Sequence, residues 1–283
     1  MGDRFRKGRA FPHCAAASRD GHCSVLNNQH FVQNHLKKRL NWMGALLACR
    51  MERKNAKSGC VVSEKRRLIV RRLGRIEYGE ALAVQKATEQ AVKEGRDPDT
   101  LLLLEHPHTL TVGRRGDSAG ILMSSELLAA RGVSVFETNR GGKVTYHGLG
   151  QIVGYPIINL SPDREDVHAF VRDLEEVLIR TLAEYEINAF RIEGFTGVHT
   201  ARGKVAAIGV HIARWITTHG FALNVNTDLS FFNLIIACDG EQVTSMQDLL
   251  GHEIDMHEVE DRLAVHFAEV FQMSAAALSQ SVL

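Results

Sequence analysis

The stretch RGGKVTYHGLGQ occupies residues 140–151, and the fold and the function of the chain are predicted outward from it. It contains four glycines, and a hydroxyl, a phenol and an imidazole follow one another at residues 145–147. Glycine permits backbone turns at positive φ and lets a ligand approach the main chain closely. Apolar segments at residues 133–137 and 152–158 flank the stretch, so we interpret it as a binding loop between two strands of a rigid scaffold. The alternative is an ordinary glycine-rich hairpin.

The bulk composition is that of an ordinary globular protein. The chain has 283 residues, of which 45% are hydrophobic and 24% are charged, and its formal net charge is +1. A chain of this length can bury a full core in one large domain or two small ones. Because the charge is nearly balanced and no apolar run is long enough to span a bilayer, we expect neither nucleic acid nor a membrane as a partner.

Residues 1–67 differ in composition from the rest of the chain. They are rich in Arg, Lys, Asn, Ser and His, poor in acidic residues, and carry no persistent helical or strand period. We therefore predict a basic, disordered N-terminal extension. Two interpretations stay open: the extension is an organelle transit peptide, or translation starts at Met43 or Met51. The expected location is the cytoplasm, with an organelle matrix as the alternative if the extension is a transit peptide.

The five cysteines do not form a disulfide or zinc pattern. Cys14, Cys23, Cys49 and Cys60 lie in the extension at spacings that match no zinc site, and Cys238 stands alone in the folded part. Odd, irregularly spaced cysteines suit a reducing compartment. A lone cysteine is most often a small buried hydrophobe, and it becomes a nucleophile only where its thiolate is stabilised.

From residue 68 onward the hydrophobic pattern becomes that of a folded domain. It predicts an edge strand with a charged end at residues 68–73, further strands at 100–105, 109–112, 133–137, 152–158, 204–212 and 216–225, and helices at 78–94, 124–131, 161–182, 244–250 and 255–271. Helices and hairpin-like strand pairs interleave irregularly, which favours an α+β fold with mixed or antiparallel sheets flanked by helices. We expect a catalytic domain over residues 68–273 and a frayed tail over 274–283.

Two residues far apart in the sequence are candidates for catalysis. Cys238 lies where an apolar run meets a polar turn, and Lys204 begins an apolar strand. If the fold brings them together, the ammonium group would stabilise the thiolate, and the neutral amine could act as a base. A surface lysine and an inert cysteine are the alternative.

Two groups of small residues are candidates for the wall of a binding site. Residues 219–222 read as a second glycine turn after an apolar strand, and residues 207–209 offer small side chains with an accessible backbone. Such residues suit the wall of a narrow apolar slot and the N–H donors of an oxyanion hole. Small residues in strands also serve merely to permit tight packing.

Taken together, these motifs resemble the lipoyl(octanoyl) transferases. The resemblance rests on RGGKVTYHGLGQ at residues 140–151, KVAAIG at 204–209, WITTHGFALNV at 215–225 and the Cys238 segment, in the order and spacing of that family. It runs from about residue 68 to about residue 271 and includes GRRG at 113–116, but it does not cover the extension.

The resemblance implies a catalytic fold similar to that of the biotin and lipoate protein ligases. It also implies transfer of an octanoyl group from octanoyl-acyl carrier protein to a lysine of lipoyl domains, in the E2 subunits of 2-oxoacid dehydrogenases and in the glycine cleavage H protein. Cys238 would carry the acyl group as a thioester, and Lys204 would stabilise its thiolate and shuttle protons. The residues implied to bind the substrate are Arg140, Gly141, Gly142, Lys143, Val144, Thr145, Tyr146, His147, Ala207, Ile208, Gly209, Gly220, Phe221 and Ala222.

No cofactor and no metal are implied, since one thioester exchanges for another at little free-energy cost and no ATP is needed. The chain departs from the family at three places: Leu149 replaces a proline, the usual Pro-Cys-Gly reads ACD at residues 237–239, and His199 stands where tryptophan is common. Two other functions are kept as alternatives: an ATP-dependent lipoate or biotin ligase of the same fold, and an inactive acyl-binding relative.

Overall fold

The computed structural model describes residues 65–236 and 242–280, with the backbone alone for 275–280. These residues belong to one compact unit, Ser63–Leu283. Its strands are β1 (Arg67–Arg75), β2 (Asp99–Glu105), β3 (Thr109–Val112), β4 (Ser134–Glu137), β5 (Val144–His147), β6 (Gln151–Ile157), β7 (Val198–Thr200), β8 (Gly203–Ala213), β9 (Ile216–Asn224) and β10 (Ser274–Gln280). Its helices are α2 (Tyr78–Lys93), α3 (Ser125–Ala130), α4 (Val167–Ala183), α5 (Met246–Leu250) and α6 (Met256–Val270), with 3-10 turns η1 (Ser118–Gly120) and η2 (Leu229–Leu234).

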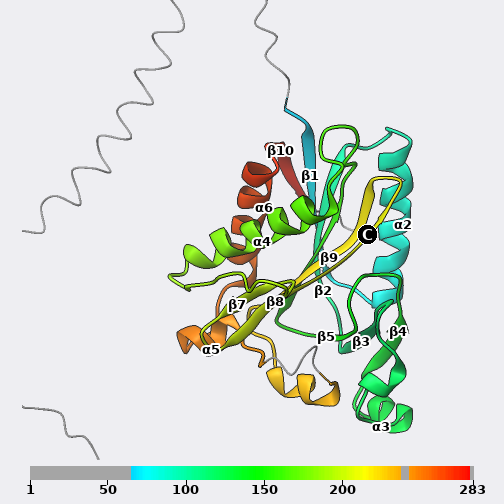
Figure 1. Cartoon of the computed structure of the whole chain (residues 1–283), viewed down its shortest axis with the longest axis vertical. Coiled ribbons are helices and arrows are strands. Elements are labelled where there is room, and N and C mark those ends of the chain that lie inside the picture. Colours follow the sequence, from blue (N-terminus) through cyan, green and yellow to red (C-terminus); the bar gives the residue numbers. More distant parts are fainter. Residues whose placement is uncertain (1–64, 237–241, 281–283) are drawn as a thin grey trace, which may run out of the picture. The chain divides into compact units, whose positions relative to one another are not determined.

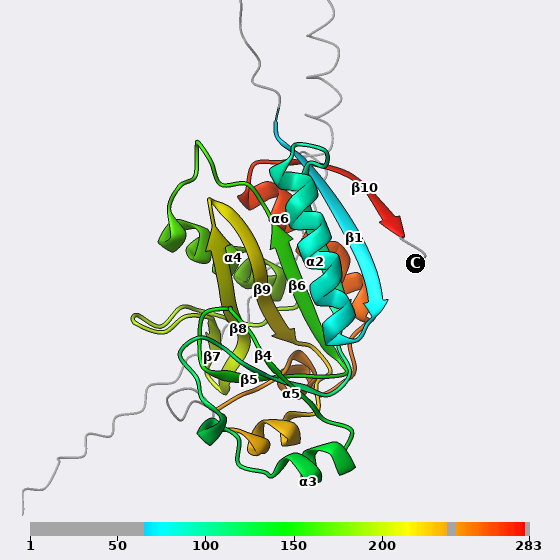
Figure 2. The same cartoon turned by 90° about the vertical axis from the view of Figure 1, so that its right-hand side faces the viewer.

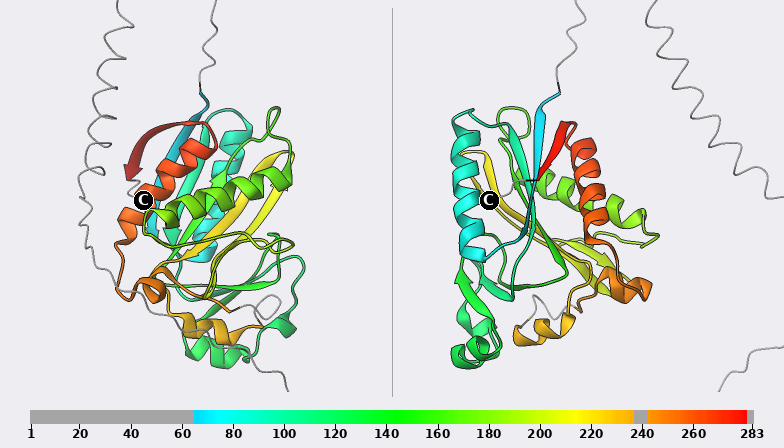
Figure 3. Two further views of the ribbon diagram at one scale, coloured as in Figure 1. Left: turned by 60° about the vertical axis from the view of Figure 1, so that its left-hand side comes forward. Right: turned by 180° about the vertical axis from the view of Figure 1, so that it is seen from behind.

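The main sheet has seven strands in the order β10-β1-β2-β6-β9-β8-β7. Parallel pairing joins β10, β1 and β2, whereas the pairs from β2 to β7 are antiparallel. Helix α2 covers one face of this sheet, and α4 and α6 cover the other (Figure 1). Figure 2 looks onto the α2 face, and the left view of Figure 3 looks onto the face under α4 and α6. The fold is therefore α+β with a mixed sheet, as the sequence predicted.

Strand β2 explains how one sheet carries two cores. Its four consecutive leucines are fully buried. Successive side chains of a strand point to opposite faces, so Leu101 and Leu103 pack with α4 and α6, while Leu102 and Leu104 pack on the α2 side. An uninterrupted apolar run is what a strand buried on both faces requires.

A second, smaller sheet has the order β4-β3-β5. Strand β3 pairs in parallel with β4 and antiparallel with β5. A separate apolar cluster supports it, which includes Leu110 and Tyr146 from the sheet, Leu128 from α3 and Leu234 from η2. The glycine-rich stretch connects the small sheet to the main sheet. It contains β5 of the small sheet, and its Gly141 N–H donates to the carbonyl of Val210 in β8 at 2.9 Å.

Several details of the sequence-based prediction were wrong. The glycine-rich stretch is not only a loop between the two strands predicted on either side of it, because it contains β5, and those two strands, β4 and β6, belong to different sheets. Strand β1 is not at the sheet edge, since β10 pairs with its outer side, and the tail that we expected to be frayed forms β10 itself. Residues 219–222 lie inside β9 rather than in a turn.

Gly220 allows two strands of the main sheet to approach one another unusually closely. A Cβ atom at this position would lie 2.1 Å from the carbonyl oxygen of Gly154 in β6. No real side chain can occupy that position, so the absence of a Cβ at Gly220 is a packing requirement. In the described part of the chain, no helix is both long enough and apolar enough to cross a membrane.

Candidate active site

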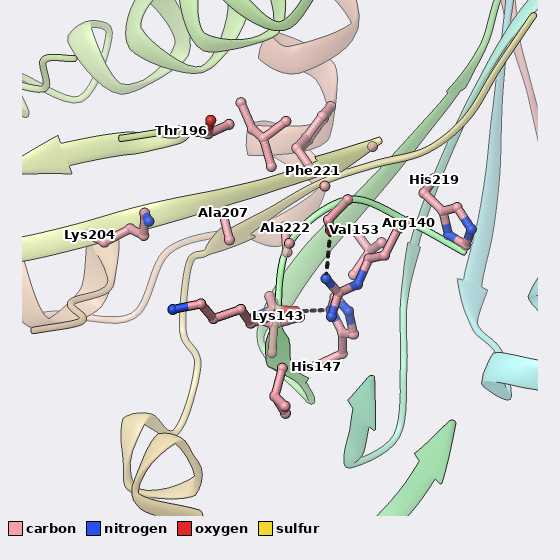
Figure 4. Close-up of a pocket in the computed structure, with 18 of the residues that line it drawn as sticks. Arg140, Lys143, His147, Val153, Thr196, Lys204, Ala207, His219, Phe221 and Ala222 are labelled. Carbon is pink, nitrogen blue, oxygen red and sulfur yellow. Dashed lines mark hydrogen bonds between the residues drawn. The ribbon is translucent and has the colours of Figure 1, made fainter. Parts of the chain in front are cut away.

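A cavity of about 390 Å³ lies where the glycine-rich stretch meets strands β6, β8 and β9. Thirteen of the fourteen residues predicted to bind substrate line it, and so does Lys204. Figure 4 shows Lys143, Arg140 and His147 from the glycine-rich stretch on one side of this space and Ala207, Phe221 and Ala222 from β8 and β9 on another. The structure thus brings segments that are about 60 to 80 residues apart in the sequence around one site.

Tyr146 is the one predicted substrate-binding residue that does not line the cavity. It is fully buried in the apolar cluster of the small sheet, where it stacks on Phe231 with ring centroids 5.2 Å apart. Its hydroxyl bonds to Nδ1 of His108 at 2.7 Å. Since Tyr146 lies between Thr145 and His147 in a strand, its side chain points to the opposite face from theirs. The prediction placed it in the site because neighbours in sequence were treated as neighbours in space.

Arg140 is held rigidly at the cavity wall. Its guanidinium donates to the hydroxyl of Thr111 from Nε at 3.1 Å and from Nη2 at 2.7 Å. It also donates to the carbonyl of Thr111 at 2.6 Å and, from Nη1, to the carbonyl of Gly141 at 2.9 Å. Hydrogen bonds to an ionised group are among the stronger ones in proteins. Arg140 therefore fixes the shape of the glycine-rich stretch from within.

A chain of buried hydrogen bonds continues from Thr111 through the core. The Thr111 hydroxyl, which accepts from Arg140, donates to Nε2 of His147 across 3.4 Å. Nδ1 of His147 then donates to Oε1 of Gln151 at 2.8 Å. This order of donors requires a neutral imidazole that carries its proton on Nδ1.

The same chain reaches the far side of the cavity through β9. Nε2 of Gln151 donates to Oδ1 of Asn224 at 2.9 Å, and Nδ2 of Asn224 donates to the carbonyl of Thr244 at 3.0 Å. The Thr244 N–H in turn donates to the carbonyl of Lys204 at 3.0 Å. One connected set of polar groups thus links the glycine-rich stretch to the strand that carries Lys204. Gln151 and Asn224 were not predicted as site residues. Gln151 begins the apolar strand β6 and Asn224 ends the apolar strand β9, and a polar residue in such a position is a signal that could have identified them.

Burial keeps three histidines and one tyrosine of this region in their neutral forms. Desolvation lowers the pKa of His147 to about 3, and the nearby His106 and the Arg140 charge contribute to the lowering. Desolvation also lowers the pKa of His106 and of His219 to about 4. Burial raises the pKa of Tyr78, a further lining residue, to about 12, partly offset by the Arg140 charge.

Because these three histidines are buried in their neutral forms, we predict that the free energy of unfolding falls on mild acidification. Each has a folded-state pKa below its ordinary value of 6.5, so the unfolded chain binds more protons between pH 6.5 and about 4. Their contribution is present above pH 6.5 and is lost as the pH falls, with a slope of about 1.4 kcal/mol per pH unit for each histidine at its steepest. Urea unfolding at pH 7, 6 and 5 measures this slope.

The matched pair of variants for that measurement is His147→Gln and His168→Gln. His147 is buried, whereas His168 is exposed on α4. We expect His147→Gln to flatten the dependence of the unfolding free energy on pH and His168→Gln to leave it unchanged. Equal slopes for wild type and His147→Gln would contradict the assignment.

Lys204 lies at the start of β8, and its backbone is paired with the segment that follows Cys238. The Lys204 N–H donates to the carbonyl of Gln242 at 2.8 Å, and Lys204 forms a parallel bridge with Val243. Val243 and, on the other side of residues 237–241, Ile235 both line the cavity. Cys238 itself lies outside the described residues. Its role, and that of Lys204, stay predictions.

The cavity also has lining residues that the sequence did not suggest. Apart from Gln151, Asn224 and Tyr78, they include Arg115, Val153, Tyr155, Phe195 and Phe232. Within residues 65–236 and 242–280, no three His, Cys, Asp or Glu side chains are grouped so that they could hold a metal ion.

Comparison with known proteins places these observations in context. Residues 77–268 match the family described as the lipoyl protein ligase A/B catalytic domain. An octanoyltransferase of Solibacter usitatus is 48% identical over 206 residues, which cover 73% of this chain and 94% of that protein. An octanoyltransferase of Caldicellulosiruptor bescii is 45% identical over 215 residues, which cover 75% of this chain and 94% of that protein.

Among solved structures, a T. acidophilum protein described as a putative lipoate protein ligase with bound lipoic acid has a similar fold. Its TM-score is 0.62 at 17% sequence identity, over 77% of this chain and 90% of that one. At this identity the likeness concerns the fold alone.

Proposed function

The chain belongs to the lipoyl protein ligase A/B catalytic domain family and is an octanoyltransferase, and we propose that a thioester on Cys238 carries the octanoyl group. The donor is octanoyl-acyl carrier protein. The acceptor is a lysine of a lipoyl domain, in the E2 subunit of a 2-oxoacid dehydrogenase or in the glycine cleavage H protein.

The observation that carries this proposal is the pairing of Lys204 with the segment that follows Cys238. The Lys204 backbone is hydrogen-bonded to Gln242 and Thr244 on either side of Val243, which lines the cavity, and Cys238 is only four residues before Gln242 in the sequence. A nucleophile and the amine that activates it must lie within reach of one another and of the substrate. An ATP-dependent ligase would give Cys238 no role.

The cavity suits an acyl chain in size and lining. Its volume of about 390 Å³ is at the lower end of the range for small-molecule sites. Val153, Ala207, Phe221 and Ala222 supply apolar walls. Burying the methylene groups of an octanoyl chain at about 0.8 kcal/mol each would contribute on the order of 5 kcal/mol to binding.

The reaction has two steps that share one proton carrier. In the first, the Cys238 thiolate attacks the thioester carbonyl of the donor, the carrier thiolate leaves, and the Lys204 ammonium gives it a proton. In the second, the neutral amine of the acceptor lysine attacks the Cys238 thioester. Its surplus proton passes to Lys204, and Cys238 leaves as a thiolate. The product is an amide, which is much more stable than a thioester and draws the reaction forward.

The proposal predicts octanoyl transfer without any nucleotide. Wild-type protein, octanoyl-acyl carrier protein and a lipoyl domain are mixed in the absence of ATP. The intact mass of the lipoyl domain is then measured by mass spectrometry. We expect the mass of one octanoyl group on the acceptor lysine, and none on a lipoyl domain whose acceptor lysine is replaced by arginine. Transfer that depends on ATP would contradict the thioester route and support a ligase.

A free thiol nucleophile also needs a reducing compartment, so the cytoplasm is the proposed location.

A further inference from the structure

The wall of the cavity changes from apolar to polar along the main sheet. Val153 of β6 pairs with Ala222 of β9, which pairs with Ala207 of β8, so these three small or apolar residues form one row. Strands β6 and β8 run in the same direction, since both are antiparallel to β9. Lys204 comes before this row along β8, and Tyr155 comes two residues after it along β6 on the same face of the sheet. The two residues therefore lie toward opposite ends of the cavity.

Tyrosine and histidine rings make up the end of the cavity that is remote from Lys204. The ring of His106 contacts both Tyr78 and Tyr155, with centroids 5.0 and 6.0 Å away. Tyr155 also meets the ring of His219 edge-on at 6.3 Å. Figure 4 shows His219 and Lys204 on opposite sides of the apolar row. Since Tyr78, Tyr155 and His219 all line the cavity, its far end is polar.

The hydroxyl of Tyr78 is a buried donor at this far end. Nδ1 of His106 donates to the carbonyl of Ile76 at 2.9 Å, so Nε2 of His106 accepts a hydrogen bond, at 2.8 Å, from the hydroxyl of Tyr155. The Tyr155 proton is thereby engaged. Tyr78 is only 1% exposed, yet its hydroxyl makes no hydrogen bond to any residue that the structure describes. Buried hydroxyls normally have a partner, so this one suits a polar atom of a ligand inside the cavity.

Other groups at this end are also incompletely paired, and they are uncharged. Gln85 of α2 accepts from the His219 N–H at 2.9 Å, whereas its buried Nε2 has no partner within residues 65–236 and 242–280. Burial raises the pKa of Tyr78 to about 12 and lowers that of His219 to about 4, so both are neutral at pH 7. Neutral donors and acceptors suit a hydroxyl or ketone oxygen, whereas the terminal methyl of an octanoyl chain makes no hydrogen bond.

We propose that the far end of the cavity binds an oxygen atom near the end of an acyl chain, and that the enzyme transfers hydroxylated or keto medium-chain acyl groups as well as octanoyl. This inference rests on the proposed function, which places the thioester carbonyl at Cys238 and Lys204, so that the chain runs past the apolar row toward Tyr78. The Tyr78 hydroxyl donates to the oxygen of the chain. The covalent steps are those of octanoyl transfer: Cys238 takes the acyl group from the carrier thioester and passes it to the acceptor amine. The oxygen at the far end of the chain is unchanged.

The test uses acyl carrier protein loaded with octanoyl, nonanoyl or 8-hydroxyoctanoyl groups. Nonanoyl and 8-hydroxyoctanoyl chains have the same length and differ only in a terminal methyl or hydroxyl. The rate at which a lipoyl domain gains each acyl mass gives kcat/KM for each donor. In wild type we expect 8-hydroxyoctanoyl to be transferred at least as efficiently as nonanoyl. In Tyr78→Phe we expect the ratio of these two kcat/KM values to fall by about 10-fold, because the chain hydroxyl then loses its donor.

Tyr185→Phe is the matched control. Tyr185 also has a buried hydroxyl without a partner among the described residues, but it does not line the cavity, so its variant should keep the wild-type ratio. Neither variant removes a hydrogen bond between described residues. We therefore expect thermal unfolding of both to match wild type, which separates an effect on specificity from an effect on folding.

A wild-type ratio below one overturns the inference, as does a ratio that Tyr78→Phe leaves unchanged. So does a Tyr78→Phe variant that gains activity equally with nonanoyl and 8-hydroxyoctanoyl, because Tyr78 would then only limit chain length. In each of these outcomes octanoyl transfer persists and the proposed function stands, whereas absence of transfer from octanoyl-acyl carrier protein would refute the proposed function instead.

Discussion

Replacing Cys238 by serine is expected to abolish octanoyl transfer, with kcat falling by roughly three orders of magnitude or more. A serine hydroxyl keeps its proton at neutral pH, and in the proposed mechanism Lys204 would stabilise a thiolate but not an alkoxide. The proposed exchange of one thioester for another, which would make the first step nearly neutral in free energy, would be lost as well. Binding of the donor should persist, because the cavity walls are unchanged.

Intact-mass measurement after incubation with octanoyl-acyl carrier protein, without acceptor, tests the intermediate directly. Wild-type protein should gain one octanoyl mass that peptide mapping assigns to Cys238, and Cys238→Ser should gain none. Cys60→Ser is the control, since Cys60 lies outside the residues that match the family, 77–268. Full activity in Cys238→Ser, or active wild-type protein that never acquires an acyl mass, would refute the thioester route.

Replacing Lys204 by alanine is expected to lower kcat by about 100-fold to 10,000-fold, which is the usual contribution of a positioned acid–base group. The ammonium group would no longer stabilise the Cys238 thiolate or protonate the leaving carrier thiolate. The fold should survive, because the bonds that Lys204 makes to Gln242 and Thr244 come from its backbone. Activity lost in Lys204→Ala should partly return at high pH, where Cys238 ionises without assistance.

Initial rates from pH 6 to pH 10, together with thermal unfolding, separate chemistry from stability. Lys86→Ala is the matched control, because Lys86 is an exposed lysine of α2 that does not line the cavity. We expect Lys86→Ala to match wild type in both measurements and Lys204→Ala to match it in thermal unfolding alone. Wild-type rates at neutral pH in Lys204→Ala would remove the lysine from the mechanism.

The secondary structure and the family followed from local patterns in the sequence. Helices α2 and α6 and strands β2, β3, β8 and β9 lie within a residue or two of their predicted positions. Their hydrophobic periods and turn residues are properties of short segments, which depend little on the rest of the chain. Helix α4 began later than predicted, because Asp166 caps it and not a residue near Ser161.

The sequence by itself therefore determined the helices and most of the strands, though not β5, β7 or β10, and also that the fold is α+β and which family the chain belongs to. Only the tertiary structure decided that Tyr146 faces the core, that β10 covers β1, and that Gln151 and Asn224 connect the glycine-rich stretch to Lys204. The physical reason is the distance along the sequence over which each kind of interaction acts. Periodicity and capping act between residues a few positions apart, whereas strand pairing and buried hydrogen bonds join residues brought together by packing of the whole domain.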